Sequence, residues 1–252
     1  MNPHKFSITL LVSLCLLSVL ELAAQKTPPP GGKVAVVVDE RLAALRVAPQ
    51  LSAKLVRRLG RGRLVAIRSA KATPNGITFL LVNISSRTHG WIQREAVVTP
   101  ARVGDDQKLF DLIDCSSDFD RIVRSRIFLN YFRASSLRER VLLMLGDAAE
   151  AVSEKLTRDA AKRVSAADVA PESSYFLNFS GLDRYNRQGV GFVFEPSTKR
   201  LHYDGASWRE IVRRYPKSPQ ANEARERLQK LETKCPTCFS KCPTCFSLSK
   251  TR

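Results

Sequence analysis

Val34-Ala-Val-Val-Val38 decides the fold of the first part of this 252-residue chain, because a short apolar run of β-branched residues is typical of a buried strand. Two similar runs follow, Arg63-Leu-Val-Ala-Ile-Arg68 and Ile77-Thr-Phe-Leu-Leu-Val-Asn83. Pro74-Asn75-Gly76 is a turn signal between these two runs. Residues 33–102 are therefore predicted to form a small β-barrel.

The spacing of apolar residues changes to that of helices from about Asp105 onward. A long helical pattern covers residues 136–164, and Pro171 ends it. A final helical hairpin is expected before residue 232. The expected organisation is residues 1–24 as a signal peptide, 25–32 as a Pro/Gly linker, 33–102 as the barrel, 105–232 as a helical domain with a loop-rich, aromatic insert at 171–205, and 233–252 as a disordered tail with cysteines.

The N-terminus has the pattern of a secretory signal. A short basic start precedes the apolar run Phe6–Leu20, and small residues follow up to Ala24, where cleavage fits best. The alternative is a membrane anchor, but a span needs about 20 apolar residues and Glu21 ends this run early. Cleavage predicts a periplasmic or secreted protein without a stable membrane span, and nucleic acid is then not expected as a partner.

Three motifs in the predicted barrel occur in a recognisable order: Leu45-Arg-Val-Ala-Pro49, Leu59-Gly-Arg-Gly62 and His89-Gly-Trp-Ile92. This order resembles the bacterial Src-homology-3-like (SH3b) family, in which glycine permits a tight turn and tryptophan supplies a large apolar plate. Phe79 stands where the family often has a second tryptophan. The resemblance implies a binding module, since members commonly bind cell-wall peptides or peptidoglycan, or dock beside another functional domain.

The helical part contains an internal echo. Tyr131-Phe-Arg-Ala-Ser-Ser136 is similar to Arg214-Tyr-Pro-Lys-Ser-Pro219, and the second copy with Ala221 and Ala224 resembles the helix-turn-helix linker of periplasmic tetratricopeptide-like repeat proteins. Two units are fewer than the three or so that a solenoid usually needs, so a compact bundle is the alternative. The expected fold class is α+β multidomain, with an SH3-like β-barrel followed by a helical-hairpin or tetratricopeptide-like domain.

The chain is strongly basic, with 41 Lys and Arg against 24 Asp and Glu, a formal charge of +17. Such a surplus favours acidic partners. Residues 33–103 hold thirteen basic and three acidic residues, which indicates a polyanion-binding face on the barrel or a merely solvated surface. The candidate ligand-binding residues are Arg46, Arg58, Arg61, Arg63, Arg68, Phe79 and Trp91.

The tail repeats the segment Lys234-Cys-Pro-Thr-Cys-Phe-Ser240 letter for letter at residues 241–247. Its four cysteines form two C-x2-C pairs separated by three residues. Structural zinc sites usually separate such pairs by a dozen or more residues. Metal binding, disulfides within or between tails, and an unstructured tail left by duplication are the alternatives.

Catalytic, metal and cofactor sites are not predicted. Only His89 and His202 remain after removal of the signal, and His202 lacks a metal-ligating partner at helical spacing. Cys115 lies among aspartates that would raise a thiol's pKa, and we expect it to be a small buried residue. An enzyme would need a catalytic cluster within residues 171–205.

Two function classes fit these observations. The first is an exported, non-catalytic binding or scaffold protein, with a barrel that docks to cell-wall or other anionic envelope polymer and a helical domain that binds a protein partner. The second is an accessory subunit of an envelope enzyme or transport assembly, in which both domains make protein contacts only. Retention on peptidoglycan favours the first class, and a stoichiometric partner without polymer binding favours the second.

Overall fold

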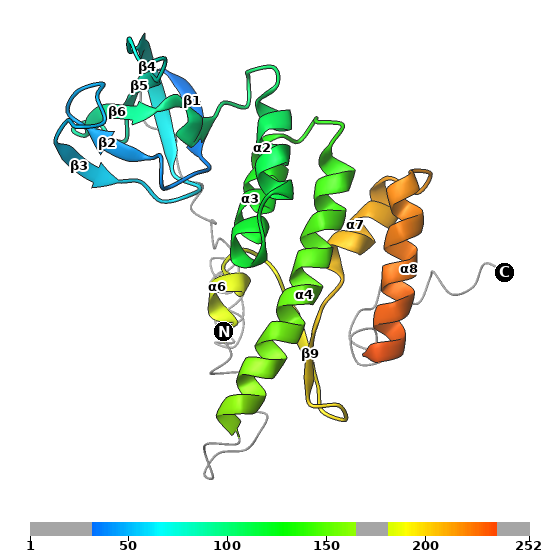
Figure 1. The fold of residues 1–252 in the computed structure, drawn as a ribbon. Helices are drawn as coiled ribbons and strands as arrows, with labels where there is room; N and C mark the ends of the chain where they lie inside the picture. Colours follow the sequence, from blue (N-terminus) through cyan, green and yellow to red (C-terminus); the bar gives the residue numbers. More distant parts are fainter. Residues whose placement is uncertain (1–31, 165–180, 236–252) are drawn as a thin grey trace, which may run out of the picture.

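The protein has two units, which Figure 1 shows side by side in a computed structural model that describes residues 32–164 and 181–235. The sheet unit covers residues 33–98, and the helical unit follows it from residue 105. This arrangement confirms the predicted α+β class. The strands of the sheet unit are β1 (Lys33–Val37), β2 (Ala44–Arg46), β3 (Leu55–Arg58), β4 (Leu64–Ala72), β5 (Thr78–Asn83), β6 (His89–Gln93) and β7 (Val97–Val98), with the short helix η3 (Arg94–Ala96) before β7.

The seven strands form one antiparallel sheet in the order β3-β2-β6-β5-β4-β1-β7. The order has two ends, β3 and β7, so the ladder does not close on itself. The expectation of a closed barrel is therefore corrected to an open sheet. Two register shifts, at Leu45/Arg46 and between Ile67 and Ser69, bend the strands locally.

The sheet curls around its own small apolar core. Successive side chains of a strand point to opposite faces, and the inward set from nearly all the strands forms a single cluster. Its members include Ala35, Val37, Leu45, Val65, Leu80, Val82, Ile92 and Val97. Val97 of the end strand β7 and Leu59, which directly follows the other end strand β3, both belong to this cluster, so the sheet wraps around it.

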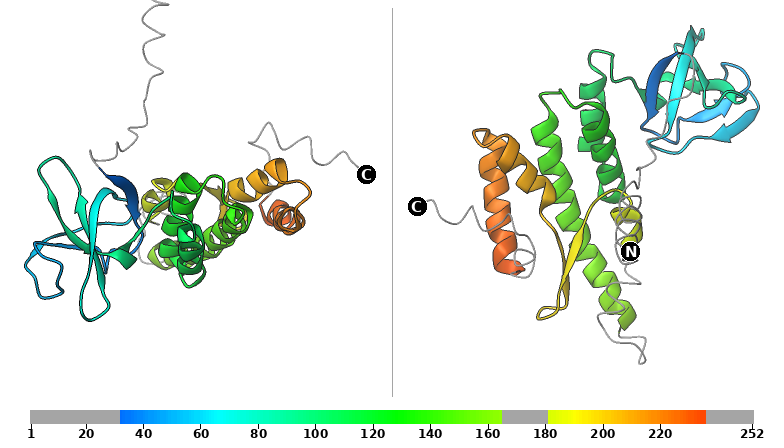
Figure 2. Two further views of the ribbon diagram at one scale, coloured as in Figure 1. Left: turned by 90° about the horizontal axis from the view of Figure 1, so that it is seen from above. Right: turned by 180° about the vertical axis from the view of Figure 1, so that it is seen from behind.

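The helical unit is built around two helical hairpins, and a small hairpin of strands lies between them in the chain (Figures 1 and 2). α3 and α4 form the first helical hairpin, and α7 and α8 form the second. The bounds are α2 (Asp105–Asp114), α3 (Asp118–Tyr131), α4 (Arg138–Val164), α6 (Asp183–Asn186), β8 (Phe192–Glu195), β9 (Arg200–Tyr203), α7 (Ala206–Arg214) and α8 (Pro219–Lys234).

The two copies of the internal echo lie at the two helix-turn-helix junctions. After α3, the N–H of Phe132 donates to the carbonyl of Phe128, and after α7 the N–H of Tyr215 donates to that of Ile211, both at 2.8 Å. Ser218 caps α8, because its hydroxyl accepts from the N–H of Ala221 at 3.2 Å. The two similar segments, residues 131–136 and 214–219, therefore lie at the same kind of helix end.

The described part of the expected loop-rich insert contains regular structure. β8 and β9 pair in register from Phe192↔Tyr203 to Glu195↔Arg200. α4 covers the other edge of β9, since Thr157 Oγ1 accepts from the N–H of Leu201 at 2.9 Å and Glu150 Oε2 from that of Tyr203 at 3.0 Å. Side chains of the long helix thus supply acceptors that a third strand would otherwise provide.

β1 joins the two units because both of its faces are buried. Ala35 and Val37 belong to the core of the sheet unit. Val36, and Val38 just after the strand, belong instead to the larger core that contains the helices. The apolar run Val34–Val38 is therefore shared between two cores. This explains why it lacks the alternation of polar and apolar residues seen in half-exposed strands.

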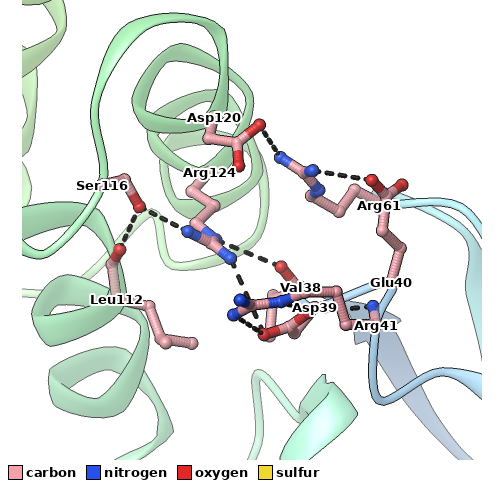
Figure 3. Close-up of polar contacts among 9 residues, drawn as sticks. All are labelled: Val38, Asp39, Glu40, Arg41, Arg61, Leu112, Ser116, Asp120 and Arg124. Carbon is pink, nitrogen blue, oxygen red and sulfur yellow. Dashed lines mark hydrogen bonds and ion pairs between the residues drawn. The ribbon is translucent and has the colours of Figure 1, made fainter.

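A polar network, here called the Arg124 network, fixes the same boundary (Figure 3). Arg124 of α3 is buried, and it donates to the carbonyl of Val38 at 3.2 Å and to the hydroxyl of Ser116. Burial lowers the pKa of this guanidinium. Beside it, the guanidinium of Arg61 donates hydrogen bonds to Glu40 of the sheet unit and to Asp120 of α3.

Some expectations are corrected or lie beyond the described residues. Cys115, expected to be buried, is exposed at the position that directly follows α2. Cys235 is buried and disulfide-bonded. The predicted signal peptide, the linker before residue 32, residues 171–180 and the remaining tail cysteines lie outside the described residues.

Candidate functional site

Two aromatic side chains lie on the outer face of the sheet unit. Leu80 and Ile92 point into the core, so their neighbours Phe79 and Trp91 point to the opposite face. Leu81 lies opposite Trp91 across the β5–β6 ladder and belongs to the same surface. Phe79 is covered almost completely, with 1 % exposed, whereas Trp91 is half-buried.

A cleft, here called the Phe79 cleft, opens beside this surface. Its volume is about 480 Å³, and it lies between the loop after β2 and the turn that joins β4 to β5. Phe79 lines it together with Pro49 and Leu51 from the loop and Lys71 and Ile77 from the hairpin. Lys71 lies directly opposite Phe79 in the β4–β5 ladder, which places its ammonium-bearing chain on the same face as the ring.

Arg46 holds one wall of the cleft in place. Its guanidinium donates to the carbonyl of Ala53 at 2.7 Å. Val47 donates to the carbonyl of Lys54 at 3.1 Å and closes the base of the same loop. Arg46 also lies opposite Trp91 in the β2–β6 ladder. The side chain predicted to contact a ligand is therefore engaged in fixing the loop that carries Leu51.

The opposite wall is held by the turn at residues 73–77. The hydroxyl of Thr73 both donates to the carbonyl of Ile77 at 3.0 Å and accepts its N–H at 3.2 Å. Gly76 has φ +76°, a left-handed conformation that favours glycine. The turn signal Pro74-Asn75-Gly76 thus shapes one side of the cleft as well as reversing the chain.

The three acidic residues of the sheet unit all lie toward the helical unit. Asp39 and Glu40 belong to the network at the boundary with α3. Glu95 interacts with the ammonium group of Lys108 in α2. Burial lowers the pKa of Lys108, and the negative charge of Glu95 opposes this effect. The Phe79 cleft is lined by a lysine and by neutral side chains, without a carboxylate. A ligand entering it meets positive charge only.

The remaining predicted residues occupy different places on the sheet unit. Arg58 is exposed on the edge strand β3, Arg63 is exposed just before β4, and Arg68 is exposed where the β4 register shifts. Arg61 is only 16 % exposed, and its guanidinium faces two carboxylates at the boundary between the units. The strand pairings place Arg46, Phe79 and Trp91 on one face of the sheet. Arg61 lies instead at the contact between the sheet unit and the helical unit.

Of the residues that line the cleft, only Phe79 is among the seven candidate ligand-binding residues. Lys71 belongs to the basic surplus of the barrel region, but its pairing with Phe79 depends on the register shift in β4. Leu51 and Ile77 come from a loop and a turn. Leu51 is half exposed, at 50 %. An exposed leucine beside a turn is a weak sequence signal, because single apolar residues are common on protein surfaces.

Within residues 32–164 and 181–235, histidine, cysteine and carboxylate side chains do not gather in a group of three that could hold a metal ion. The same ranges contain no helix that is both long and apolar enough to span a bilayer. Comparison of the chain with protein-family models, with curated proteins and with solved structures found no significant match.

Proposed function

We propose that this chain is an exported, non-catalytic binding protein whose sheet unit docks onto an anionic polymer of the cell envelope through the Phe79 cleft. The single observation that carries the proposal is the cleft itself. It combines apolar walls, to which the nearly covered Phe79 ring contributes, with Lys71, and it lies on the part of the sheet unit that has no carboxylates. Such a site suits a polymer ligand that carries apolar groups and a carboxylate or phosphate.

The likeness to SH3b domains supports the same function. The sheet unit is small, antiparallel and curled around its own core, and its Gly-Trp segment forms β6. Gly90 is required there because a β-carbon would come within 2.7 Å of the Arg46 carbonyl oxygen. For the helical unit we propose a tetratricopeptide-like role, in which the two helical hairpins hold a protein partner.

The test is retention on purified peptidoglycan at low and high salt. Retention should weaken as salt rises, because the Debye length falls from about 10 Å at 0.1 M to about 3 Å at 1 M. Lys71→Glu should weaken retention about tenfold, equivalent to about 1.4 kcal/mol. Arg87→Glu is the matched control, since it reverses an exposed charge on the turn before β6. Equal loss in both variants, or no retention at low salt, would refute the proposal.

A second candidate is an accessory subunit that makes protein contacts only. Of the five large apolar side chains exposed in the described ranges, four lie on the β2–β3 hairpin. They are Val47, Leu51, Leu55 and Val56, with exposures from 43 % to 58 %. Apolar groups gathered on an edge hairpin favour a protein surface as partner. Recovery of a stoichiometric partner, without retention on peptidoglycan, would select this candidate.

A further inference from the structure

A separate pocket lies in the helical unit, where β9 packs along α4 beside the end of α8. Its volume is about 180 Å³, and we call it the His202 pocket. All of its lining residues belong to the helical unit, and it is independent of the function proposed above. The side chains that decide its chemistry are Glu150, Glu154, Arg158, Arg200, His202 and Lys234.

His202 is the unusual member of this pocket. It is 5 % exposed, and neither of its ring nitrogens has a hydrogen-bond partner within the described chain. Nδ1 lies 3.6 Å from Oε1 of Glu150, an ion pair only when the imidazole is protonated. A buried polar group without a partner costs free energy, so this imidazole favours a ligand in the pocket that can form a hydrogen bond with it.

Glu150 sets how the imidazole is protonated. Burial acts to raise the pKa of Glu150, but His202 and the N–H of Tyr203 outweigh burial, so its pKa lies below the ordinary value. An ionised carboxylate beside Nδ1 favours a proton on that nitrogen. Nε2 then carries a lone pair in the neutral ring and a second N–H in the imidazolium. Only the imidazolium offers an anion a donor.

Three cations line the same pocket. Arg158 extends from α4, Arg200 from β9 and Lys234 from the last residue of α8. Neither arginine has an ion pair within 4 Å in the described part of the chain. Two carboxylates oppose these three cations, and Glu150 is already occupied by the N–H of Tyr203. The pocket therefore has an excess of positive charge before His202 is protonated.

We infer that the His202 pocket binds a compact tetrahedral oxyanion, of the size of phosphate or sulfate. Arg158, Arg200 and Lys234 neutralise its charge, and His202 donates from Nε2 while Nδ1 donates to Glu150. Binding takes up one proton from solvent wherever the free ring is neutral, and that proton becomes the second N–H of the ring. No bond of the anion forms or breaks.

The site therefore binds more tightly at acidic pH. The charged groups that face the pocket are Glu150, Glu154 and Arg158 from α4, Arg200 from β9 and Lys234 from α8. Carboxylates, arginine and lysine ordinarily keep their charge between about pH 5.5 and 8, and imidazole does not. The second N–H that the anion requires on His202 is thus what links its affinity to the proton concentration.

The experiment is a titration of the purified protein with sulfate, whose charge stays constant over this range, at an ionic strength held with sodium chloride. Isothermal calorimetry gives the affinity, and the ring signals of His202 in NMR spectra report its protonation. Saturable binding is expected at pH 5.5 and at least tenfold weaker binding at pH 8. Acetate, which is planar, should bind more weakly than sulfate at pH 5.5.

Three variants locate the site. Arg200→Gln should weaken sulfate binding at least fivefold at both pH values, and His202→Gln should abolish the pH dependence. Arg87→Gln, which removes an exposed charge from the sheet unit, should bind as the unchanged protein does. The inference is overturned if sulfate binding is absent at pH 5.5, if affinity is equal at both pH values, or if Arg87→Gln loses as much as Arg200→Gln.

Discussion

The indole ring of Trp208 in α7 lies directly against the backbone of Gly146 in α4. A β-carbon built on Gly146 would touch Nε1 of the ring and would come within 2.6 Å of Cε2 and 2.7 Å of the Ser207 hydroxyl. Trp208 also packs edge to face on Tyr203, with 5.3 Å between ring centroids. The missing side chain at one position of α4 is what allows α7 to approach it so closely.

Replacing Gly146 with alanine should therefore destabilise the protein, despite the higher helix propensity of alanine. The methyl group must displace the indole, and overpacking of this kind costs about 1–3 kcal/mol. Urea denaturation followed by tryptophan fluorescence measures the loss. Gly60→Ala is the matched control, because a β-carbon added at Gly60 would have no neighbouring atom within 4 Å. Equal stability of the two variants would contradict this account.

Arg124→Met should weaken the attachment of the two units. Methionine keeps much of the buried volume but leaves the carbonyl of Val38 and the hydroxyl of Ser116 without this donor. An unsatisfied buried group costs about 1–3 kcal/mol, so the free energy of unfolding should fall by about that amount. Denaturation curves recorded for both units test this. Arg133→Met, on an exposed side chain, should change stability little.

Asp39 should make stability depend on acidic pH. The side-chain hydrogen bonds from Arg41 lower its pKa in the folded protein and outweigh the opposing effect of burial. As pH falls below the ordinary carboxyl pKa of about 4, the unfolded chain takes up the proton first, so stability is present above that pH and lost below it. Asp39→Asn should therefore make stability fall less steeply between pH 5.5 and pH 3. Chemical denaturation at pH 5.5 and pH 3 measures it, and the exposed Asp183→Asn should retain the full dependence.

Arg46→Gln should loosen the loop over the Phe79 cleft. The hydrogen bond from Arg46 to the Ala53 carbonyl is lost, while the Val47–Lys54 bond at the base of the loop remains. Amide hydrogen exchange in residues 48–53 should become faster, and exchange in β5 should not change. Arg68→Gln removes a charge from the same sheet without touching the loop. Slow exchange in the Arg46 variant would show that other contacts hold the loop.

Local sequence patterns predicted most of the secondary structure. Val34–Val38, residues 63–68 and residues 77–83 correspond to β1, β4 and β5, and the helical spacing after Asp105 corresponds to α2 through α4. Ser218 and Pro219 begin α8 as its cap and first helical residue, positions that these residue types favour. These features succeed because period and capping are properties of neighbouring residues.

Pairings between distant residues could not be predicted in the same way. Arg61 and Asp120 are 59 residues apart, and Arg124 and Val38 are 86 apart. The position of Lys71 beside Phe79 depends on a register shift that one extra residue in β4 creates. Glu150 and His202 meet because α4 covers the free edge of β9. Each of these contacts follows from tertiary packing rather than from spacing along the chain.

The double burial of β1 has a consequence for how this protein can be divided or inherited. A fragment cut at the connection near Val103 would leave one half without the valines that seal its interior and the other with those valines exposed to water. Neither unit could therefore be transferred to another protein by recombination and still keep a complete core. Tolerated changes in Val36 or Val38 should therefore be accompanied by compensating changes among the helices, so that the two units evolve as one piece.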